Sequence, residues 1–123
     1  MSTTTAKVQA DRLAALDQLC GLYPFVSVLK GSGTIIQQQG NPAVINTLGN
    51  PGMASAGTGD VLAGMIGAYM GQQLQAFEAA KAGVYIHACC AEGFAGKKDE
   101  SGLIASDIIH LIPEVVRQIR ARA

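Results

Sequence analysis

The segment from Asn50 to Gly64 constrains the fold of this chain most, because a loop rich in glycine, proline and serine runs directly into an apolar helix. The turn between them is Gly57–Asp60, and the helix that we expect after it is Val61–Met70. The first N–H groups of a helix have no partner inside the helix, and the helix dipole makes that end positive. The segment therefore predicts an anion-binding site at the start of a buried helix.

The residue types of this turn suit phosphate chemistry. Gly57 and Gly59 let the backbone approach a phosphate with no side chain between them. Asp60 follows in the first helical turn, where a carboxylate can accept a proton from a substrate hydroxyl while the amides stabilise a transferring phosphoryl group. A short glycine pattern is a weak signal by itself, and a plain loop that ends in a favourable first-turn acid would look the same.

Before the loop, the sequence predicts one helix and three short strands. Leucines recur at helical spacing over Val8–Leu19, with charged and polar residues between them, and glycine and proline then end the helix. Short apolar runs bounded by turn residues follow it. The predicted strands are Phe25–Leu29, Thr34–Gln37 and Ala43–Asn46.

After the strands, the sequence predicts a loop and three helices. Thr47–Thr58 is too rich in turn residues for a regular element. The helix at Val61–Met70 is followed by a long buried helix at Gln75–Ala95 and by a charged turn at Lys97–Glu100. Pro113 is expected to start the final helix, because proline is well tolerated in the first turn.

Small residues lie one turn apart on the helix that follows the loop. They are Gly64 and Ala68, then Gly67 and Gly71. Glycine inside a helix costs about 1 kcal/mol relative to alanine. We therefore expect this face to pack very closely against another backbone.

Composition and element order together predict an α/β fold in one domain, residues 1–123. Hydrophobic residues make up 49% of the chain but aromatic residues only 5%, so the core is built from aliphatic and small side chains. Few strands are available to cover many apolar helix faces. We therefore expect the sheet to be incomplete in one chain, with an open edge that invites pairing.

Charge and cysteine content exclude several classes of protein. Nine Lys and Arg balance nine Asp and Glu, so no broad field attracts nucleic acid or a membrane surface. Three cysteines without a framework spacing argue against a secreted disulfide scaffold, and residues 1–6 carry no apolar run typical of a signal peptide. We expect a cytoplasmic protein. His87, Cys89 and Cys90 lie close together, but no second ligand cluster accompanies them, so we assign no metal site.

The loop and helix also carry a resemblance to a known family. Gly57–Gly64, preceded by Asn50–Ala54, resembles the signature of the ADP/ATP-dependent NAD(P)H-hydrate dehydratases, the YjeF C-terminal domain family of the ribokinase-like superfamily. Val28–Thr34 resembles that family's nucleotide-binding strand and turn. Val8–Arg12 and Gly102–Asp107 match in order and spacing. The resemblance covers nearly the whole chain and implies the C-terminal half of a ribokinase-like, Rossmann-like three-layer fold.

The resemblance implies repair of hydrated NADH or NADPH. The family phosphorylates the ring hydroxyl with ADP or ATP, and phosphate then leaves, so that water is formally lost. Magnesium is expected with the phosphate donor. No nucleic acid or membrane partner is implied.

The resemblance also implies roles for individual residues. Asp60 matches the family's base and a substrate contact, and Gly57, Thr58 and Gly59 match its anion hole. The adenine nucleotide is expected to contact Gly59 and the turn made of Lys30, Gly31, Ser32, Gly33 and Thr34. Asn50 is a candidate substrate contact, although turn chemistry explains an asparagine there nearly as well.

Two departures from the family pattern matter. Ala56 stands where the family commonly has another glycine, so its methyl group could crowd the phosphate loop. The family's domain is also about twice as long, and the half that carries most of the nicotinamide pocket precedes the matching region. We expect a homo-oligomer or a partner chain that supplies this half.

Two further functions remain open from the sequence. A small-alcohol kinase of the same superfamily, for a thiazole or a sugar, would share the loop chemistry and differ only in the acceptor. A non-catalytic nucleotide-binding or oligomerisation module is the other alternative. Lys30 at a predicted strand end is equally compatible with phosphate binding and with simple solvation.

Overall fold

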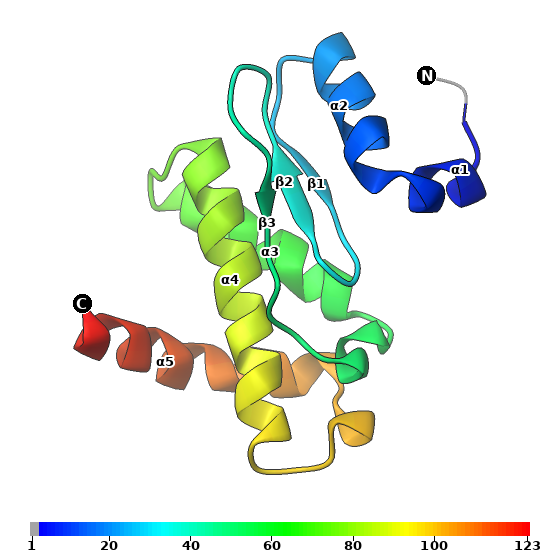
Figure 1. The fold of residues 1–123 in the computed structure, drawn as a ribbon. Coiled ribbons are helices and arrows are strands. Elements are labelled where there is room, and N and C mark those ends of the chain that lie inside the picture. Colours follow the sequence, from blue (N-terminus) through cyan, green and yellow to red (C-terminus); the bar gives the residue numbers. More distant parts are fainter. Residues whose placement is uncertain (1–2) are drawn as a thin grey trace.

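The computed structural model describes residues 3–123 and shows an α/β fold (Figure 1). The sequence expectation that residues 1–6 are not a signal peptide includes residues 1–2, which lie outside the described residues. In chain order the elements are α1 (Thr5–Ala10), α2 (Arg12–Leu22), β1 (Ser27–Leu29), β2 (Ile35–Gln37), β3 (Val44–Ile45), the 3-10 turn η1 (Pro51–Ala54), α3 (Thr58–Gly71), α4 (Ala76–Ala95), the 3-10 turn η2 (Glu100–Gly102) and α5 (Ala105–Arg122).

The three strands form one antiparallel sheet in the order β1-β2-β3. Val28 lies opposite Ile36, and Ile36 in turn lies opposite Val44. The central strand β2 is therefore paired on both sides, and β1 and β3 are the edges. This agrees with the predicted α/β class and with the predicted incomplete sheet.

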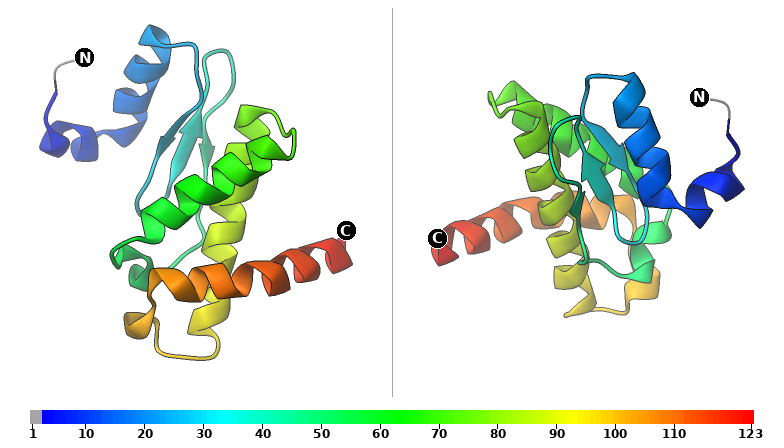
Figure 2. Two further views of the ribbon diagram at one scale, coloured as in Figure 1. Left: turned by 180° about the vertical axis from the view of Figure 1, so that it is seen from behind. Right: turned by 45° about the horizontal axis from the view of Figure 1, so that its top comes forward.

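Helices cover both faces of the sheet and produce three layers. One face packs against α2 through a small core of Leu16, Cys20 and Ile35. The other packs against α3 and α4 through Leu62, Ala80, Val84 and the central Ile36. The views in Figure 2 show α2 on one side of the sheet and the pair α3 and α4 on the other.

A second core joins α4 to α5 and holds the lower half of the molecule. Cys90, Ala91 and Phe94 of α4 pack against Leu103 and Ile108 in this core. Burial, the larger effect, and the neighbouring Cys89 raise the pKa of the Cys90 thiol to about 12. Cys90 therefore behaves as a small apolar core residue.

The first predicted helix is two helices in the structure. Asp11 has a non-helical backbone, and its carboxylate accepts a hydrogen bond from Ala14 N–H at 2.9 Å. An aspartate that caps the N-terminus of a helix satisfies one of its free N–H groups. The helical pattern from Val8 to Leu19 therefore breaks at this residue.

The prediction that Pro113 starts the last helix is wrong. α5 begins at Ala105, eight residues earlier in the chain, and Pro113 lies inside it. The Asp107 carboxylate accepts a hydrogen bond from Ile104 N–H at 3.0 Å and so caps the true start. Pro113 is exposed, so the hydrogen bond lost at the proline faces water, while buried Ile108 and Val115 hold the helix against the core.

The small-residue face of α3 is exposed in this chain, contrary to the expectation of close packing. Gly64, Gly67 and Gly71 have no atom of another segment within 4 Å of an added Cβ. The close approach between helices occurs instead at Gly83 of α4, where a Cβ would lie 2.7 Å from Ile66 Cγ1. The glycine pattern on α3 therefore has no packing partner among residues 3–123.

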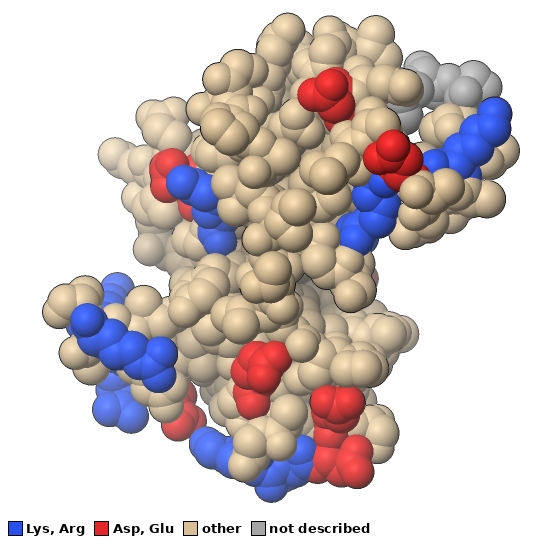
Figure 3. Space-filling model, viewed as in Figure 1, with Lys and Arg blue, Asp and Glu red and all other residues tan. Residues whose placement is uncertain are grey.

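Charged side chains form no single-sign surface. On the face shown in Figure 3, acidic and basic residues are both present, and basic side chains lie over the C-terminal end of α5 and in several other places. This distribution agrees with the balanced charge of the sequence. No helix among the described residues is long and apolar enough to cross a membrane.

Two glycine-to-alanine substitutions should have opposite effects on stability. In Gly52→Ala, the added Cβ would overlap the backbone oxygen of Glu100, and we expect a loss of about 1–3 kcal/mol, as for other overpacked sites. Gly64→Ala adds a methyl group in open space on a helix, and we expect a gain of about 1 kcal/mol. Urea unfolding measures both. A destabilising Gly64→Ala would mean that this face is packed in solution.

Candidate functional site

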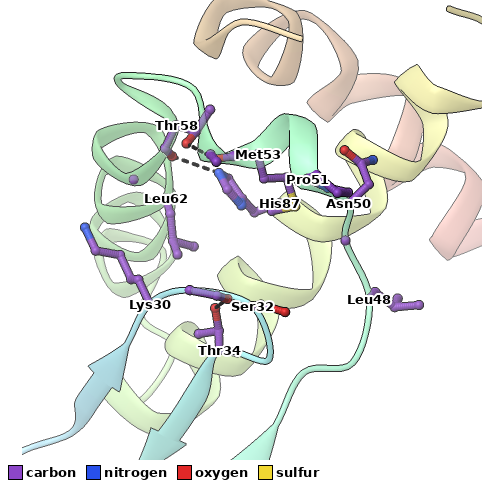
Figure 4. Close-up of a pocket in the computed structure, with 14 residues that line it drawn as sticks. Lys30, Ser32, Thr34, Leu48, Asn50, Pro51, Met53, Thr58, Leu62 and His87 are labelled. Atoms are coloured by element: carbon purple, nitrogen blue, oxygen red, sulfur yellow. Dashed lines mark hydrogen bonds between the residues drawn. The ribbon is translucent and has the colours of Figure 1, made fainter. Parts of the chain in front are cut away.

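A cleft of about 430 Å³ lies between the sheet and the start of α3 (Figure 4). Its size is within the range of small-molecule sites, roughly 300–1,000 Å³. The β1–β2 turn, the loop before α3, the first turn of α3 and one residue of α4 form its walls. The lining residues are Lys30, Gly31, Ser32, Thr34, Leu48, Gly49, Asn50, Pro51, Met53, Ala54, Thr58, Gly59, Leu62 and His87.

The N-terminus of α3 offers free backbone donors. Gly57 precedes the helix with φ +86°, a left-handed conformation that favours glycine, and it makes no side-chain cap. The N–H groups of Asp60 and Val61 both donate to Gly57 O at 3.1 Å. Those of Gly57 and Gly59 donate to no acceptor within residues 3–123. The sequence predicts an anion-binding site at this helix end, and the free donors fit that prediction.

Lys30 brings a positive charge to the same point. A Cβ added at Gly59 would lie 2.9 Å from Lys30 Nζ, so the ammonium group lies directly beside the first turn of α3. In the described part of the chain, no carboxylate forms a salt bridge with Lys30. A cation beside the positive end of a helix is unfavourable, and an anion bound between them would relieve the repulsion. The placement therefore favours phosphate binding by Lys30 over simple solvation.

Thr58 has a different role from its two glycine neighbours. Its buried hydroxyl donates to Met53 O at 2.6 Å and lies 2.9 Å from Ser55 O. Its N–H also points to Ser55 O, at 3.5 Å. The side chain therefore ties the loop to the start of α3, and the free amides of the predicted anion hole are those of Gly57 and Gly59.

His87 links α4 to this helix start. Its Nε2–H donates to Thr58 O at 2.8 Å, and the side chain is buried. Burial lowers the pKa of His87 and nearby Lys30 lowers it further, while the hydrogen bond to Thr58 opposes them. The ring is therefore neutral at pH 7, with the proton on Nε2. The sequence analysis weighed this histidine as a metal ligand and missed the contact with Thr58; a single polar residue on a buried helix face is the signal for it.

Asn50 lines the cleft, but its side-chain amide already has protein partners. Nδ2 donates to Ala91 O at 2.9 Å, and Oδ1 accepts from Gly52 N–H at 3.0 Å. These bonds anchor the loop to α4 and start the turn η1. Asn50 therefore has a structural role, and its contact with substrate stays a prediction.

The predicted nucleotide turn forms one wall of the cleft. Lys30, Gly31, Ser32 and Thr34 line it, and Gly33 does not. The Thr34 hydroxyl donates to Gly31 O at 3.0 Å and closes the turn on itself. Thr34 therefore shapes the turn, and Gly31 and Ser32 are the residues that present it to the cleft.

Asp60 lies outside the cleft wall, in the first turn of α3. It is exposed, and its carboxylate accepts no hydrogen bond from residues 3–123. It is therefore free to meet a substrate on the outer side of the helix start, a side that the described residues leave open. Ala56 is exposed as well and is not in a left-handed conformation, so its methyl group causes no backbone strain.

Arg12 is a further residue near the site that the sequence prediction did not single out. It belongs to the block Val8–Arg12 but reads as one polar residue on an amphipathic helix. In the structure its guanidinium group donates to backbone oxygens of the β1–β2 turn. Nothing in the local sequence pattern predicts this contact.

A family model described as NAD(P)H-hydrate dehydratase matches residues 1–114. A bifunctional NAD(P)H-hydrate repair enzyme from Coxiella burnetii is 43% identical over 102 residues, which are 83% of this chain and 21% of that protein. An ADP-dependent (S)-NAD(P)H-hydrate dehydratase from Neisseria meningitidis is 37% identical over 99% of this chain and 40% of its own length. The chain therefore spans well under half of these relatives.

Solved structures share the fold. An ADP/ATP-dependent NAD(P)H-hydrate dehydratase from Bacillus subtilis, co-crystallised with ATP and Mg²⁺, superimposes with a TM-score of 0.85 at 29% identity, over 90% of this chain and 40% of that one. A ribokinase-like superfamily protein from Enterococcus faecalis has a TM-score of 0.77 at 28% identity, over 90% of this chain and 38% of that one. These matches confirm the predicted ribokinase-like half.

The lowered pKa of His87 predicts a loss of stability in mild acid. The unfolded chain takes up a proton at the ordinary pKa of histidine, about 6.5, whereas the folded chain does so only at lower pH. The contribution of His87 to the free energy of unfolding should therefore be constant above about pH 6.5. Below that pH it should fall by at most about 1.4 kcal/mol per pH unit, until the pKa of His87 in the folded chain is passed.

Urea unfolding of the chain and of His87→Gln between pH 5 and 7.5 tests this. Glutamine keeps an N–H donor and does not titrate. The difference between the two stability curves isolates the effect of His87 from those of the carboxylates and of His110. A difference that does not change with pH would contradict the assignment.

Proposed function

We propose that this chain, which belongs to the NAD(P)H-hydrate dehydratase family, supplies the phosphoryl-transfer site of an ADP- or ATP-dependent dehydratase that repairs hydrated NADH or NADPH. One observation carries the proposal. Within residues 3–123, Lys30 lies beside an uncapped helix start with free Gly57 and Gly59 amides, and the Asp60 carboxylate, which has no partner among these residues, follows in the same turn. Positioning, anion stabilisation and a base are what phosphoryl transfer requires.

In this proposal the cleft holds the adenine nucleotide. Lys30 to Thr34 form the nucleotide wall, and the phosphates approach the amides of Gly57 and Gly59 next to the Lys30 ammonium. Asp60 accepts the proton of the ring hydroxyl on the outer side of the helix start. Asn50 lines the cleft rather than the outer side, so its predicted substrate contact would be made from the cleft.

The chemistry balances without an oxidant or reductant. The ring hydroxyl attacks the terminal phosphorus, its proton passes to Asp60, and AMP or ADP leaves from ADP or ATP. The ring C–O bond then breaks with phosphate as the leaving group. Loss of a proton from the neighbouring ring carbon restores the double bond, so that water is formally removed.

Magnesium would enter with the phosphate donor. No group of three His, Cys, Asp or Glu in the described part of the chain forms a metal site. Mg²⁺ commonly binds through substrate phosphates, waters and one or two carboxylates, which fits this residue set. The ion would neutralise phosphate charge beside the amides of Gly57 and Gly59, while Asp60 keeps its role as the base.

The acceptor is the part of the proposal that rests on relatives. The Neisseria protein is named for ADP-dependent dehydration of NAD(P)H hydrate, and the Bacillus structure for ADP or ATP. A small-alcohol kinase would use the same helix start, and its acceptor would keep the phosphate. Release of phosphate distinguishes the two reactions.

We also propose that another polypeptide segment completes the site, either a second copy of this chain or a separate one. The exposed Asp60, the unpaired edge of β1 and the exposed glycine face of α3 support this. Glycines let a second helix approach closely, and an open sheet edge invites a further strand. We further propose a cytoplasmic location, which the three free cysteines of the chain suit.

Turnover is the direct test of the proposed activity. Purified chain is mixed with hydrated NADH, Mg²⁺ and ADP or ATP, and the absorbance of reduced nicotinamide is followed together with phosphate release. We expect nucleotide-dependent recovery with equal phosphate. Asp60→Asn should lower the rate by about 100-fold or more, the scale of losing a general base, and leave ADP affinity unchanged.

Glu78→Gln is the matched control, because it makes the same carboxylate-to-amide change at a pair with Lys81 on α4. Its rate should equal that of the unsubstituted chain. An unchanged rate in Asp60→Asn would remove the base role. Transfer of phosphate to an alcohol without its release would favour the kinase.

Light scattering across a concentration series tests completion by a second copy. We expect a mass above that of the monomer, and a shift toward the monomer in Gly67→Leu, because leucine there blocks the α3 face. Gln9→Leu on exposed α1 is the control for added surface leucine. A clean monomer at every concentration would exclude self-association and leave a separate chain as the partner.

A further inference from the structure

Arg12 is bound to the carbonyl oxygens of the β1–β2 turn. Its Nη2 donates to Leu29 O at 2.9 Å and to Lys30 O at 3.3 Å. Its Nη1 donates to Gly33 O at 3.3 Å and also to Ser32 O. One guanidinium group from the start of α2 therefore holds four carbonyl oxygens on both arms of the turn.

The turn that Arg12 holds presents its amides on the other side. The N–H groups of Gly31, Ser32 and Gly33 donate to no acceptor within residues 3–123. Gly31 and Ser32 line the cleft, whereas Arg12 does not. The carbonyl side of the turn is thus occupied by Arg12, and its donors remain available to a ligand.

The geometry of the turn leaves little freedom around the guanidinium group. Gly31 has φ +140°, and a Cβ there would lie 3.2 Å from Arg12 Nη2. Gly33 has φ +64°, so the turn uses two left-handed residues. Glycine reaches such conformations without steric cost, so contacts with side chains select this one. Thr34 supplies a contact from within the turn, and Arg12 supplies the contacts from α2.

The hydrogen-bond acceptors of the Arg12 guanidinium group are these four carbonyl oxygens. In the described chain no carboxylate forms a salt bridge with Arg12, and its buried Nε has no hydrogen-bond partner. The neighbouring Asp11 is used to cap α2. A planar fork of donors suits several acceptors at fixed positions, which a lysine ammonium cannot reproduce.

We propose that Arg12 is a positioning residue for the nucleotide: it fixes the Lys30–Gly33 turn from behind so that the amides of this turn and the Lys30 side chain face the cleft. The inference deepens the proposed function and rests on it for the identity of the ligand. Arg12 acts through the turn and touches no reacting atom.

A purely structural role would be to attach α2 to the sheet. The chain offers a matched control for this role, because Gln37 Nε2 of β2 donates to Asp17 Oδ1 of α2 at 2.9 Å. Asp17→Ala removes a contact between α2 and the sheet without touching the turn. If Arg12 only attached α2 to the sheet, substitutions at Arg12 and at Asp17 should lower ADP affinity alike. If Arg12 holds the Lys30–Gly33 turn in place, only the Arg12 substitutions should lower it.

The test compares Arg12→Lys, Arg12→Ala and Asp17→Ala with the unsubstituted chain. ADP affinity is measured by calorimetry in the presence of Mg²⁺. We expect about a tenfold or greater loss of affinity in both Arg12 variants, the scale of losing charge-assisted hydrogen bonds, and no change in Asp17→Ala. Added guanidinium chloride at low millimolar concentration should partly restore ADP affinity in Arg12→Ala but not in Arg12→Lys, whose ammonium group occupies the site.

Amide relaxation measured by NMR without ligand tests whether Arg12 holds the Lys30–Gly33 turn rigid. The N–H groups of Gly31, Ser32 and Gly33 should become mobile in both Arg12 variants and stay rigid in Asp17→Ala. Rigid turn amides in Arg12→Lys, or unchanged ADP affinity, would overturn the inference while the proposed function stands. If the unsubstituted chain binds no ADP, the nucleotide role of Arg12 fails together with the proposed function, and relaxation alone still reports the clamp.

Discussion

The site depends on the buried position of Thr58, where three segments are joined through backbone oxygens. The Thr58 hydroxyl holds the loop before α3 through Met53 O and Ser55 O, and the Thr58 carbonyl accepts the His87 N–H from α4. These contacts fix the direction in which α3 begins. Since the free amides of Gly57 and Gly59 lie on either side of Thr58, their direction is fixed with it.

The opposite wall of the cleft is built by the same means. Arg12 holds the β1–β2 turn through four carbonyl oxygens, and Lys30 extends from that turn to the start of α3. Two positive features, a helix end and an ammonium group, are thus brought together by elements on different sides of the sheet. Their mutual repulsion destabilises the folded chain when no ligand is bound, and a bound phosphate group would offset it.

Much of this arrangement is predictable from local sequence. The Gly57–Asp60 turn, the strands and the long helix α4 follow from turn chemistry and apolar periodicity. The start of α5 does not, because buried Ile108 and Val115 outweigh the helix-breaking tendency of Pro113. The roles of Arg12 and His87 are set by contacts to carbonyls 17 and 29 residues away in sequence, which no local pattern encodes.

The reliance on carbonyl oxygens has a consequence for how such a site can diverge. Every residue type carries the same carbonyl group, so substitution within the segments 29–33 and 53–57, away from the glycines with positive φ, changes side chains but leaves these acceptors unchanged. An insertion or deletion of one residue would move them away from Arg12 or Thr58. The lengths of these two loops are therefore under tighter constraint than most of their residue identities, and drift should accumulate as replacement, with the spacing between the holding side chain and its acceptors preserved.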